Sequence, residues 1–250
     1  CERCRCHSKD KHPAILYTLL SQNLRPGGAR QRCLCQQRRT VCLRSPHLTC
    51  QAASHVLVKT INFMKNVAAF HLLPREDQLL LLDSCWVPLF LLGLVQEMVT
   101  FEVMEAPAPS MLKKILSGQS KGQEPEGTQP TLAAVQRLQW CLNSFWRLDL
   151  SPSEYTYLRG AILFNPDIPG LRAPLYIESL QWEAQRALRE LLHPEDQGRF
   201  CRILRVTSSS RCIPAGLVTA LFFRPVIGDA DMGELLVEML FEVTGRPPAP

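Results

Sequence analysis

Two patterns in the sequence have residue types that could carry chemistry, a serine flanked by glycines and a group of N-terminal cysteines. Gly118-Gln-Ser120-Lys-Gly122 matches the G-x-S-x-G pattern of serine hydrolases. In those enzymes the serine sits in a strained turn between a strand and a helix, whereas here it lies in a polar stretch, residues 117–130, without any large apolar residue. The six histidines are scattered, and no glycine-rich phosphate loop occurs. We therefore predict that the protein is not an enzyme.

The cysteines resemble a metal site over a short stretch only. Cys1-x2-Cys4, with Cys6 and His7 beside it, offers thiolate and imidazole ligands at a spacing that zinc sites use. The next cysteines provide no second C-x2-C pair, so neither a two-module cysteine finger nor a C2H2 finger can be assembled; they are Cys33, Cys35, Cys42 and Cys50. We predict no metal site and a tail with free thiols.

Short leucine motifs are a stronger signal. Leu16-Tyr-Thr-Leu19-Leu20 is an L-x-x-L-L sequence, and its i, i+3, i+4 spacing places three leucines on one face of a helix. Leu112-Lys-Lys-Ile115-Leu116 has the same geometry with isoleucine in the fourth place. Such a face suits a hydrophobic groove on a partner. The first motif stands in a polar tail without other apolar residues to pack on, which favours a docking peptide.

A third match, Leu188-Arg-Glu-Leu191-Leu192, has a different context. It ends a long amphipathic helix and continues that helix's apolar stripe. We interpret it as core packing.

The N-terminal fifth differs in composition from the rest of the 250-residue chain. Residues 1–50 hold 10 of the 28 Lys and Arg but two of the 23 Asp and Glu, a net charge of +8, whereas the other 200 residues have 18 basic and 21 acidic side chains, a net charge of −3. We expect a loosely structured basic tail over 1–50, a folded domain over 51–243 and a Pro-rich end over 244–250. The run Arg30–Arg39 leaves nuclear import or nucleic-acid binding open as an alternative.

The cysteine count and the apolar stretches bear on the compartment. An odd number of cysteines and the lack of an N-x-[ST] sequon argue against a secreted disulfide scaffold. The longest apolar stretch, Leu79–Val95, contains Asp83 and Pro88 and falls short of the roughly 20 residues that a bilayer requires. We predict a reducing compartment, a buried core helix and no membrane association.

The periodicity of the folded part is helical. Apolar residues recur at helical spacing in long runs, among them Ser54–His71 and Glu76–Thr100. Thr131 is a typical N-cap, and Ser151-Pro-Ser-Glu154 is a capping box. No alternating strand pattern of useful length occurs. We predict an all-α fold of about ten helices, with an exposed loop over 117–130.

One long pattern resembles a known family. Phe70-x2-Leu73-x3-Asp77-Gln78-x2-Leu81-Leu82-x3-Trp86 is similar to the signature of the nuclear-receptor ligand-binding domain. Leu148–Asp167 resembles the segment that joins the family's seventh and eighth helices, and Leu221–Leu240 resembles its end. Together these blocks cover about residues 50–243. The resemblance implies a three-layer antiparallel α-helical sandwich, of the type found in orphan receptors without a DNA-binding domain.

The resemblance also implies a binding site. The family holds L-x-x-L-L helices in a groove with a charge clamp, a lysine late in the third helix and a glutamate in the last. Asn62-Phe-Met-Lys65 resembles the lysine's segment, and Glu238 matches the glutamate. The residues around it match the apolar pattern of the activation helix; they are Leu235, Leu236, Met239 and Leu240. Lys65 would meet the carbonyl end of a docked helix and Glu238 its amide end.

Partners and location follow from the same resemblance. It implies a nuclear transcriptional corepressor that docks its leucine motifs into the ligand-binding domains of other nuclear receptors, displaces coactivators and recruits corepressor and histone deacetylase complexes. Without a zinc-finger domain or the family's usual β-hairpin between Phe101 and Thr131, we expect no direct DNA binding and no cofactor. A lipophilic ligand in a lipid-sensing role, a homodimer and a cytoplasmic fraction stay open.

Overall fold

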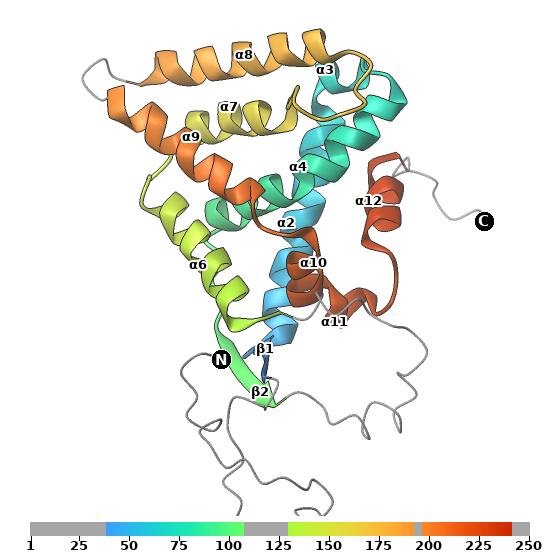
Figure 1. The fold of residues 1–250 in the computed structure, drawn as a ribbon, viewed down its shortest axis with the longest axis vertical. Helices are drawn as coiled ribbons and strands as arrows, with labels where there is room; N and C mark the ends of the chain where they lie inside the picture. Colours follow the sequence, from blue (N-terminus) through green and yellow to red (C-terminus); the bar gives the residue numbers. More distant parts are fainter. Residues whose placement is uncertain (1–38, 108–129, 193–196, 242–250) are drawn as a thin grey trace, which may run out of the picture. The chain divides into compact units, whose positions relative to one another are not determined.

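The computed structural model describes residues 39–107, 130–192 and 197–241. Helices make up most of these ranges, and two short strands pair with each other (Figure 1). In chain order the elements are β1 Arg39–Leu43, α2 Pro46–Asn66, α3 Ala68–His71, α4 Arg75–Gln96, β2 Val103–Pro107, α6 Leu132–Trp146, α7 Pro152–Leu163, α8 Pro174–Leu191, α9 Gln197–Arg211, α10 Ala215–Val218, the π-helix η6 Thr219–Phe223, α11 Arg224–Ile227 and α12 Met232–Phe241.

The other helices are arranged around α4 (Figure 1). Every side chain of α4 from Cys85 to Val95 is buried. α2 packs on one side of α4, α6 and α9 pack on another, and α7 lies between α4 and α8. The predicted three-layer antiparallel α-helical sandwich is therefore confirmed. By length and composition α4 could cross a bilayer, but most of it is buried inside the fold, as a core helix would be.

The signature residues Asp77 and Gln78 connect the start of α4 to distant backbone. Asp77 is fully buried, and its two carboxylate oxygens accept hydrogen bonds from the backbone N–H groups of Arg172, at 2.8 Å, and Ala173, at 2.9 Å. The Gln78 side chain donates to the Leu73 carbonyl, at 2.9 Å. Arg172 and Ala173 precede α8, so the signature fixes the start of α8 to the start of α4.

A close crossing joins α2 to α4. A Cβ atom at Gly93 would lie 2.7 Å from Cγ1 of Val56, so only glycine lets the two helices approach so nearly. The apolar face of α2 is thereby held against the central helix.

The two predicted N-caps are present. The Thr131 hydroxyl accepts a hydrogen bond from the Ala134 N–H, at 3.3 Å. At α7, the Ser151 hydroxyl accepts from the Glu154 N–H while the Glu154 carboxylate accepts from the Ser151 N–H, as a capping box requires. The starts of α6 and α7 could be predicted from the sequence because each cap is contained within four consecutive residues.

The N-terminal boundary of the fold differs from the prediction. β1 pairs with β2 and α2 begins at Pro46, whereas we expected loose chain up to residue 50. The residue types of Phe101–Met104 favour a strand, and β2 begins within that stretch. Each strand has only five residues, too few for a clear alternation, and its partner is distant in sequence. α2 also ends at Asn66, so that the expected single helix to His71 is divided at Val67. The short α3 that follows carries the fully buried Phe70.

The C-terminal helical run from Ala215 to Ile227 is interrupted by a π-helix, η6. η6 buries two consecutive aromatic residues, Phe222 and Phe223, which a regular helix would turn 100° apart. Their rings contact those of Phe90, Trp86 and Phe101, with centroid separations from 5.1 to 6.4 Å. This aromatic cluster joins η6 to α4 and to Phe101.

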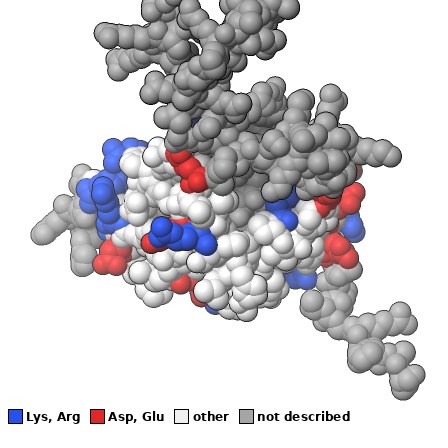
Figure 2. All heavy atoms as spheres, turned by 90° about the horizontal axis from the view of Figure 1, so that it is seen from below, with Lys and Arg blue, Asp and Glu red and all other residues white. Residues whose placement is uncertain are grey.

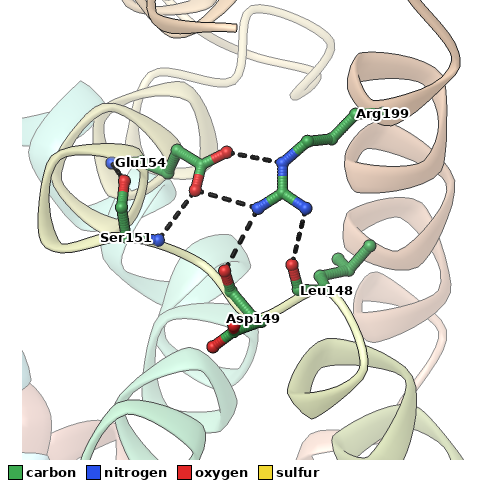
Figure 3. A network of polar contacts seen from close by, with 5 residues as sticks. All are labelled: Leu148, Asp149, Ser151, Glu154 and Arg199. Carbon is green, nitrogen blue, oxygen red and sulfur yellow. Dashed lines mark hydrogen bonds and ion pairs between the residues drawn. The ribbon is translucent and has the colours of Figure 1, made fainter. Parts of the chain in front are cut away.

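A network of polar contacts connects Arg199 of α9 to the residues around the start of α7 (Figure 3). The Arg199 guanidinium donates two hydrogen bonds to the Glu154 carboxylate, at 2.8 and 3.0 Å, and others to the carbonyls of Leu148, at 2.7 Å, and Asp149, at 3.2 Å. Burial by itself raises the pKa of Glu154, but the hydrogen bonds from Arg199 and Ser151 and the charge of Arg199 outweigh burial and hold the pKa below its ordinary value. The network joins α9 to the turn between α6 and α7.

This network predicts a pH-dependent stability. Because the pKa of Glu154 is lower in the folded chain than in the unfolded chain, its contribution is fully present above the unfolded value of about 4.3 and is lost as the pH falls through the folded value. We expect Glu154→Gln to lower the free energy of unfolding by about 1–3 kcal/mol at pH 7. Below about pH 4 the difference from wild type should shrink. Urea unfolding at pH 7 and pH 3 measures both.

The matched control is Glu190→Gln. Glu190 pairs with Arg186 on α8, with both side chains exposed, and its loss should change stability by less than about 0.5 kcal/mol. A Glu154→Gln difference of the same size at both pH values would contradict a role for the charge.

Candidate functional site

α12 forms one wall of the candidate site. Its Met232, Leu236 and Leu240 are buried, and their i, i+4, i+8 spacing places them on one face, which packs on α2 and α4. Glu238 lies outside this stripe and is exposed. The predicted activation-helix residues therefore divide into two buried leucines, Leu236 and Leu240, and two half-buried flanking residues, Leu235 and Met239.

α2 forms the second wall, and Lys65 lies in its last turn. Ser54, Val58, Ile61 and Lys65 follow at i, i+4, i+7 and i+11 and therefore share one face of the helix. Ser54 lines a hollow against Pro225 and Val226 of α11, so the start of this face is turned toward α11, and α2 also packs on α12. Val58 is 44% exposed and leaves apolar surface next to Lys65.

The backbone around Lys65 is fixed from two directions. The His71 imidazole Nε2 lies 2.5 Å from the Lys65 carbonyl oxygen, and the Val67 N–H donates to the Met64 carbonyl, at 3.3 Å. The ring of the buried Phe70 meets that of His71 edge to face, with centroids 6.2 Å apart. The end of α2 is thus held by α3.

The floor between the walls comes from the first turns of α4. The Arg75 guanidinium carbon lies 4.2 Å from the ring centroid of Phe241 on α12, so the side of α4 that carries Arg75 looks toward α12. Leu79, one turn later on that side, is half-buried. We call Lys65 of α2, Leu79 of α4 and Glu238 of α12 together the clamp face.

The clamp face thus has apolar surface with a cation at one helix end and a carboxylate on the opposite helix. A short amphipathic helix exposes unpaired carbonyls at its C-terminus and unpaired N–H groups at its N-terminus. A lysine favours the first and a glutamate the second. The clamp face is therefore chemically suited to a docked helix.

The predicted docking motifs lie outside the described residues. These are Leu16, Leu19 and Leu20 in the first motif and Leu112, Ile115 and Leu116 in the second. The third copy is described: Leu188 is fully buried and Leu191 is 45% exposed. Leu188 therefore packs in the core, as we interpreted it, and the third copy cannot present its leucines together.

An aromatic cluster occupies the interior between α4 and η6. It consists of Trp86, Phe90, Phe101, Phe222 and Phe223. A hollow of about 670 Å³ lies at the surface between the start of α2 and α11. Its lining residues are Pro46, His47, Cys50, Gln51, Ser54, Pro225 and Val226. This hollow is large enough for a small lipophilic molecule.

Three of the six described cysteines are buried in the fold. All six are free, and Cys50, Cys85 and Cys141 are buried. Burial raises the pKa of each of these three thiols, that of Cys141 to about 11 with a further contribution from the nearby Cys212. Such thiols stay protonated at neutral pH and are poor nucleophiles. Among residues 39–107, 130–192 and 197–241, no group of three His, Cys, Asp or Glu side chains is arranged to hold a metal ion.

Sequence reasoning did not identify several residues that position the site. Arg75 and Phe241 meet although they are far apart in the chain. Arg224 donates to the carbonyl of Gly228, at 2.7 Å, in the turn before α12. The only sequence signal was that Arg75 occupies one of the unspecified positions of the signature, between Leu73 and Asp77, and that Phe241 immediately follows the activation-helix pattern.

Comparisons with known proteins agree with this geometry. Residues 43–217 match the family described as the ligand-binding domain of nuclear hormone receptor. The chain is 55% identical to nuclear receptor subfamily 0 group B member 2 of Rattus norvegicus over 249 residues, covering 95% of this chain and 96% of that protein. It is 53% identical to the Homo sapiens protein of the same name over 246 residues, again covering 95% and 96%.

More distant proteins share part of the chain or the fold alone. Nuclear receptor subfamily 0 group B member 1 of Homo sapiens is 39% identical over 223 residues, which cover 81% of this chain and 47% of that protein. Among solved structures, the ultraspiracle ligand binding domain from Drosophila melanogaster matches with a TM-score of 0.54 and 24% identity, covering 81% of this chain and 82% of that one. This last likeness concerns the fold.

Proposed function

We propose a function from an established premise: this chain belongs to the family of nuclear hormone receptor ligand-binding domains. Within that family we propose that it is a transcriptional corepressor that works through leucine-rich helices. The observation that carries the proposal is α12, which packs on α2 and α4 with Glu238 exposed on its outer side and Lys65 at the end of α2.

The clamp face is the acceptor in this proposal. A helix with the L-x-x-L-L pattern lays its leucines on the apolar floor near Leu79, while Lys65 meets its last carbonyls and Glu238 its first N–H groups. Each clamp contact contributes about 0.3–1 kcal/mol at an exposed site, and each fully buried leucine about 1.5–3 kcal/mol. The leucines therefore provide most of the affinity, and the clamp sets length and direction.

The chain also carries donors for the same kind of face. The motifs Leu16–Leu20 and Leu112–Leu116 would dock into the ligand-binding domains of other nuclear receptors and displace the coactivators that use that groove. The chain's own face would then be available for corepressor and histone deacetylase complexes. This mechanism places the protein in the nucleus and requires no DNA contact of its own.

A ligand sensor is the second candidate, favoured by the surface hollow between α2 and α11. A bound lipid there would raise the melting temperature of the protein, and a thermal-shift series with long-chain fatty acids measures this. We rank it second because the aromatic cluster occupies the interior. On the face shown in Figure 2 the described part is largely uncharged and carries both basic and acidic side chains.

The acceptor role predicts weaker peptide binding in clamp variants. Lys65→Ala and Glu238→Ala should each weaken binding of a synthetic L-x-x-L-L peptide about 2- to 5-fold, measured by fluorescence anisotropy at low salt. Arg137→Ala on α6 and Glu178→Ala on α8, both exposed, are matched controls and should bind like wild type. Equal binding by all four variants would place the peptide elsewhere.

The donor role predicts loss of receptor binding in motif variants. Against a panel of purified receptor ligand-binding domains, Leu19→Ala/Leu20→Ala or Ile115→Ala/Leu116→Ala should weaken binding about 100-fold, since each leaves two leucine-type contacts unmade. A coactivator peptide should compete with the wild-type chain. Leu191→Ala, in the third copy, is the control. If both double variants bind like wild type, these motifs do not make the contact.

A further inference from the structure

The position of α12 is determined by contacts at both of its ends. At its C-terminal end, the Arg75 guanidinium carbon lies 4.2 Å from the Phe241 ring centroid, within the range of a cation–π contact. At its N-terminal end, Arg224 donates to the carbonyl of Gly228, at 2.7 Å, and lies 3.4 Å from that of Ala230. Both arginines belong to other elements, α4 and α11, so each connects α12 or its turn to the body of the fold.

The turn before α12 is itself well defined. Gly228 has a φ of +60°, a conformation that L side chains rarely adopt. The Asp231 carboxylate accepts a hydrogen bond from the Glu234 N–H, at 2.9 Å, as an N-cap does. The direction in which α12 leaves α11 is therefore set by this turn and by Arg224.

The surface under α12 consists of protein side chains. Met232, Leu236 and Leu240 are buried, and α12 packs on α2 and α4, so the inner face of α12 is covered by side chains of the fold.

From these contacts we propose that Arg75 and Arg224 form a latch that holds α12 in its docked position without an interior ligand. We call the contacts of Arg75 with Phe241 and of Arg224 with Gly228 and Ala230 the α12 latch. The latch makes Arg75 and Arg224 positioning residues for the clamp face, because they fix where Glu238 stands relative to Lys65. This inference rests on the proposed function of the clamp face, but the position of α12 can be measured separately.

Hydrogen exchange of the full chain, purified without added lipid, tests the latch. The amides of residues 232–241 should be protected in wild type. Arg75→Met, which keeps the apolar stem but loses the charge, should accelerate their exchange about 2- to 5-fold. Arg75→Lys should restore most of the protection, because an ammonium can also face the ring. Arg224→Ala should accelerate exchange most in the first turn of α12.

A double variant and a control isolate the contact. Phe241→Leu combined with Arg75→Met should exchange no faster than the faster of the two single variants, since both remove the same interaction. Arg186→Met removes another cation–π contact, with Trp182 on α8 at 5.2 Å, and should leave residues 232–241 unchanged. The melting temperature of the Arg186→Met variant controls for a general loss of stability.

The outcomes separate the latch from the proposed function. Faster exchange confined to α12, with weaker L-x-x-L-L peptide binding, supports the latch and its role. Unchanged exchange in Arg75→Met, an equal increase over the whole domain, or an unprotected α12 in wild type would each overturn the latch. A wild-type chain that binds no leucine peptide would refute the acceptor function, while the exchange pattern would still decide on the latch.

Discussion

From Cys85 to Val95, α4 exposes no side chain to solvent, and a helix with apolar side chains all round must be covered on every side. α2, α6, α7, α9 and α12 each pack on it, and three layers of helices are the result. Each fully buried Leu or Phe contributes about 1.5–3 kcal/mol, so this one helix organises a large part of the core. The N-terminal end of α4 carries the exceptions: Asp77 is buried but fully hydrogen-bonded to the start of α8, and Arg75 reaches α12.

Local patterns predicted the parts of the fold that depend on a few consecutive residues. The caps at Thr131 and Ser151 and the central helix are of this kind, since cap chemistry and helical periodicity both act within one or two turns. β1 and β2 are five residues each and pair only with each other, so their stability depends on a partner that no local pattern names. The division of α2 from α3 at Val67 likewise follows from the burial of Phe70, which is a tertiary effect.

The candidate site divides in the same way. Lys65 and Glu238 could be proposed as clamp residues from the sequence because each stands in a short recognisable pattern. The family match covers residues 43–217 and ends before α12, so Glu238 was proposed from its local pattern alone. Arg75, Phe241 and Arg224 were not, because their roles arise only when α4, α11 and α12 are assembled. The pattern around Glu238 gives no indication that the aromatic ring at its end meets an arginine from α4. On the proposed function, the residues that recognise a partner are therefore more visible in sequence than those that position them.

The proposed latch constrains how such a domain can be regulated. A ligand shifts an equilibrium between docked and undocked α12 only by the difference in its affinity for the two states. Where contacts from α4 and α11 already hold both ends of α12, the docked state needs no ligand to be populated. The docked state is then set by the sequence, and control passes to whatever competes for the clamp face. A chain that carries leucine-rich donors as well as an acceptor is, on the proposed function, regulated by the concentrations and affinities of its partners.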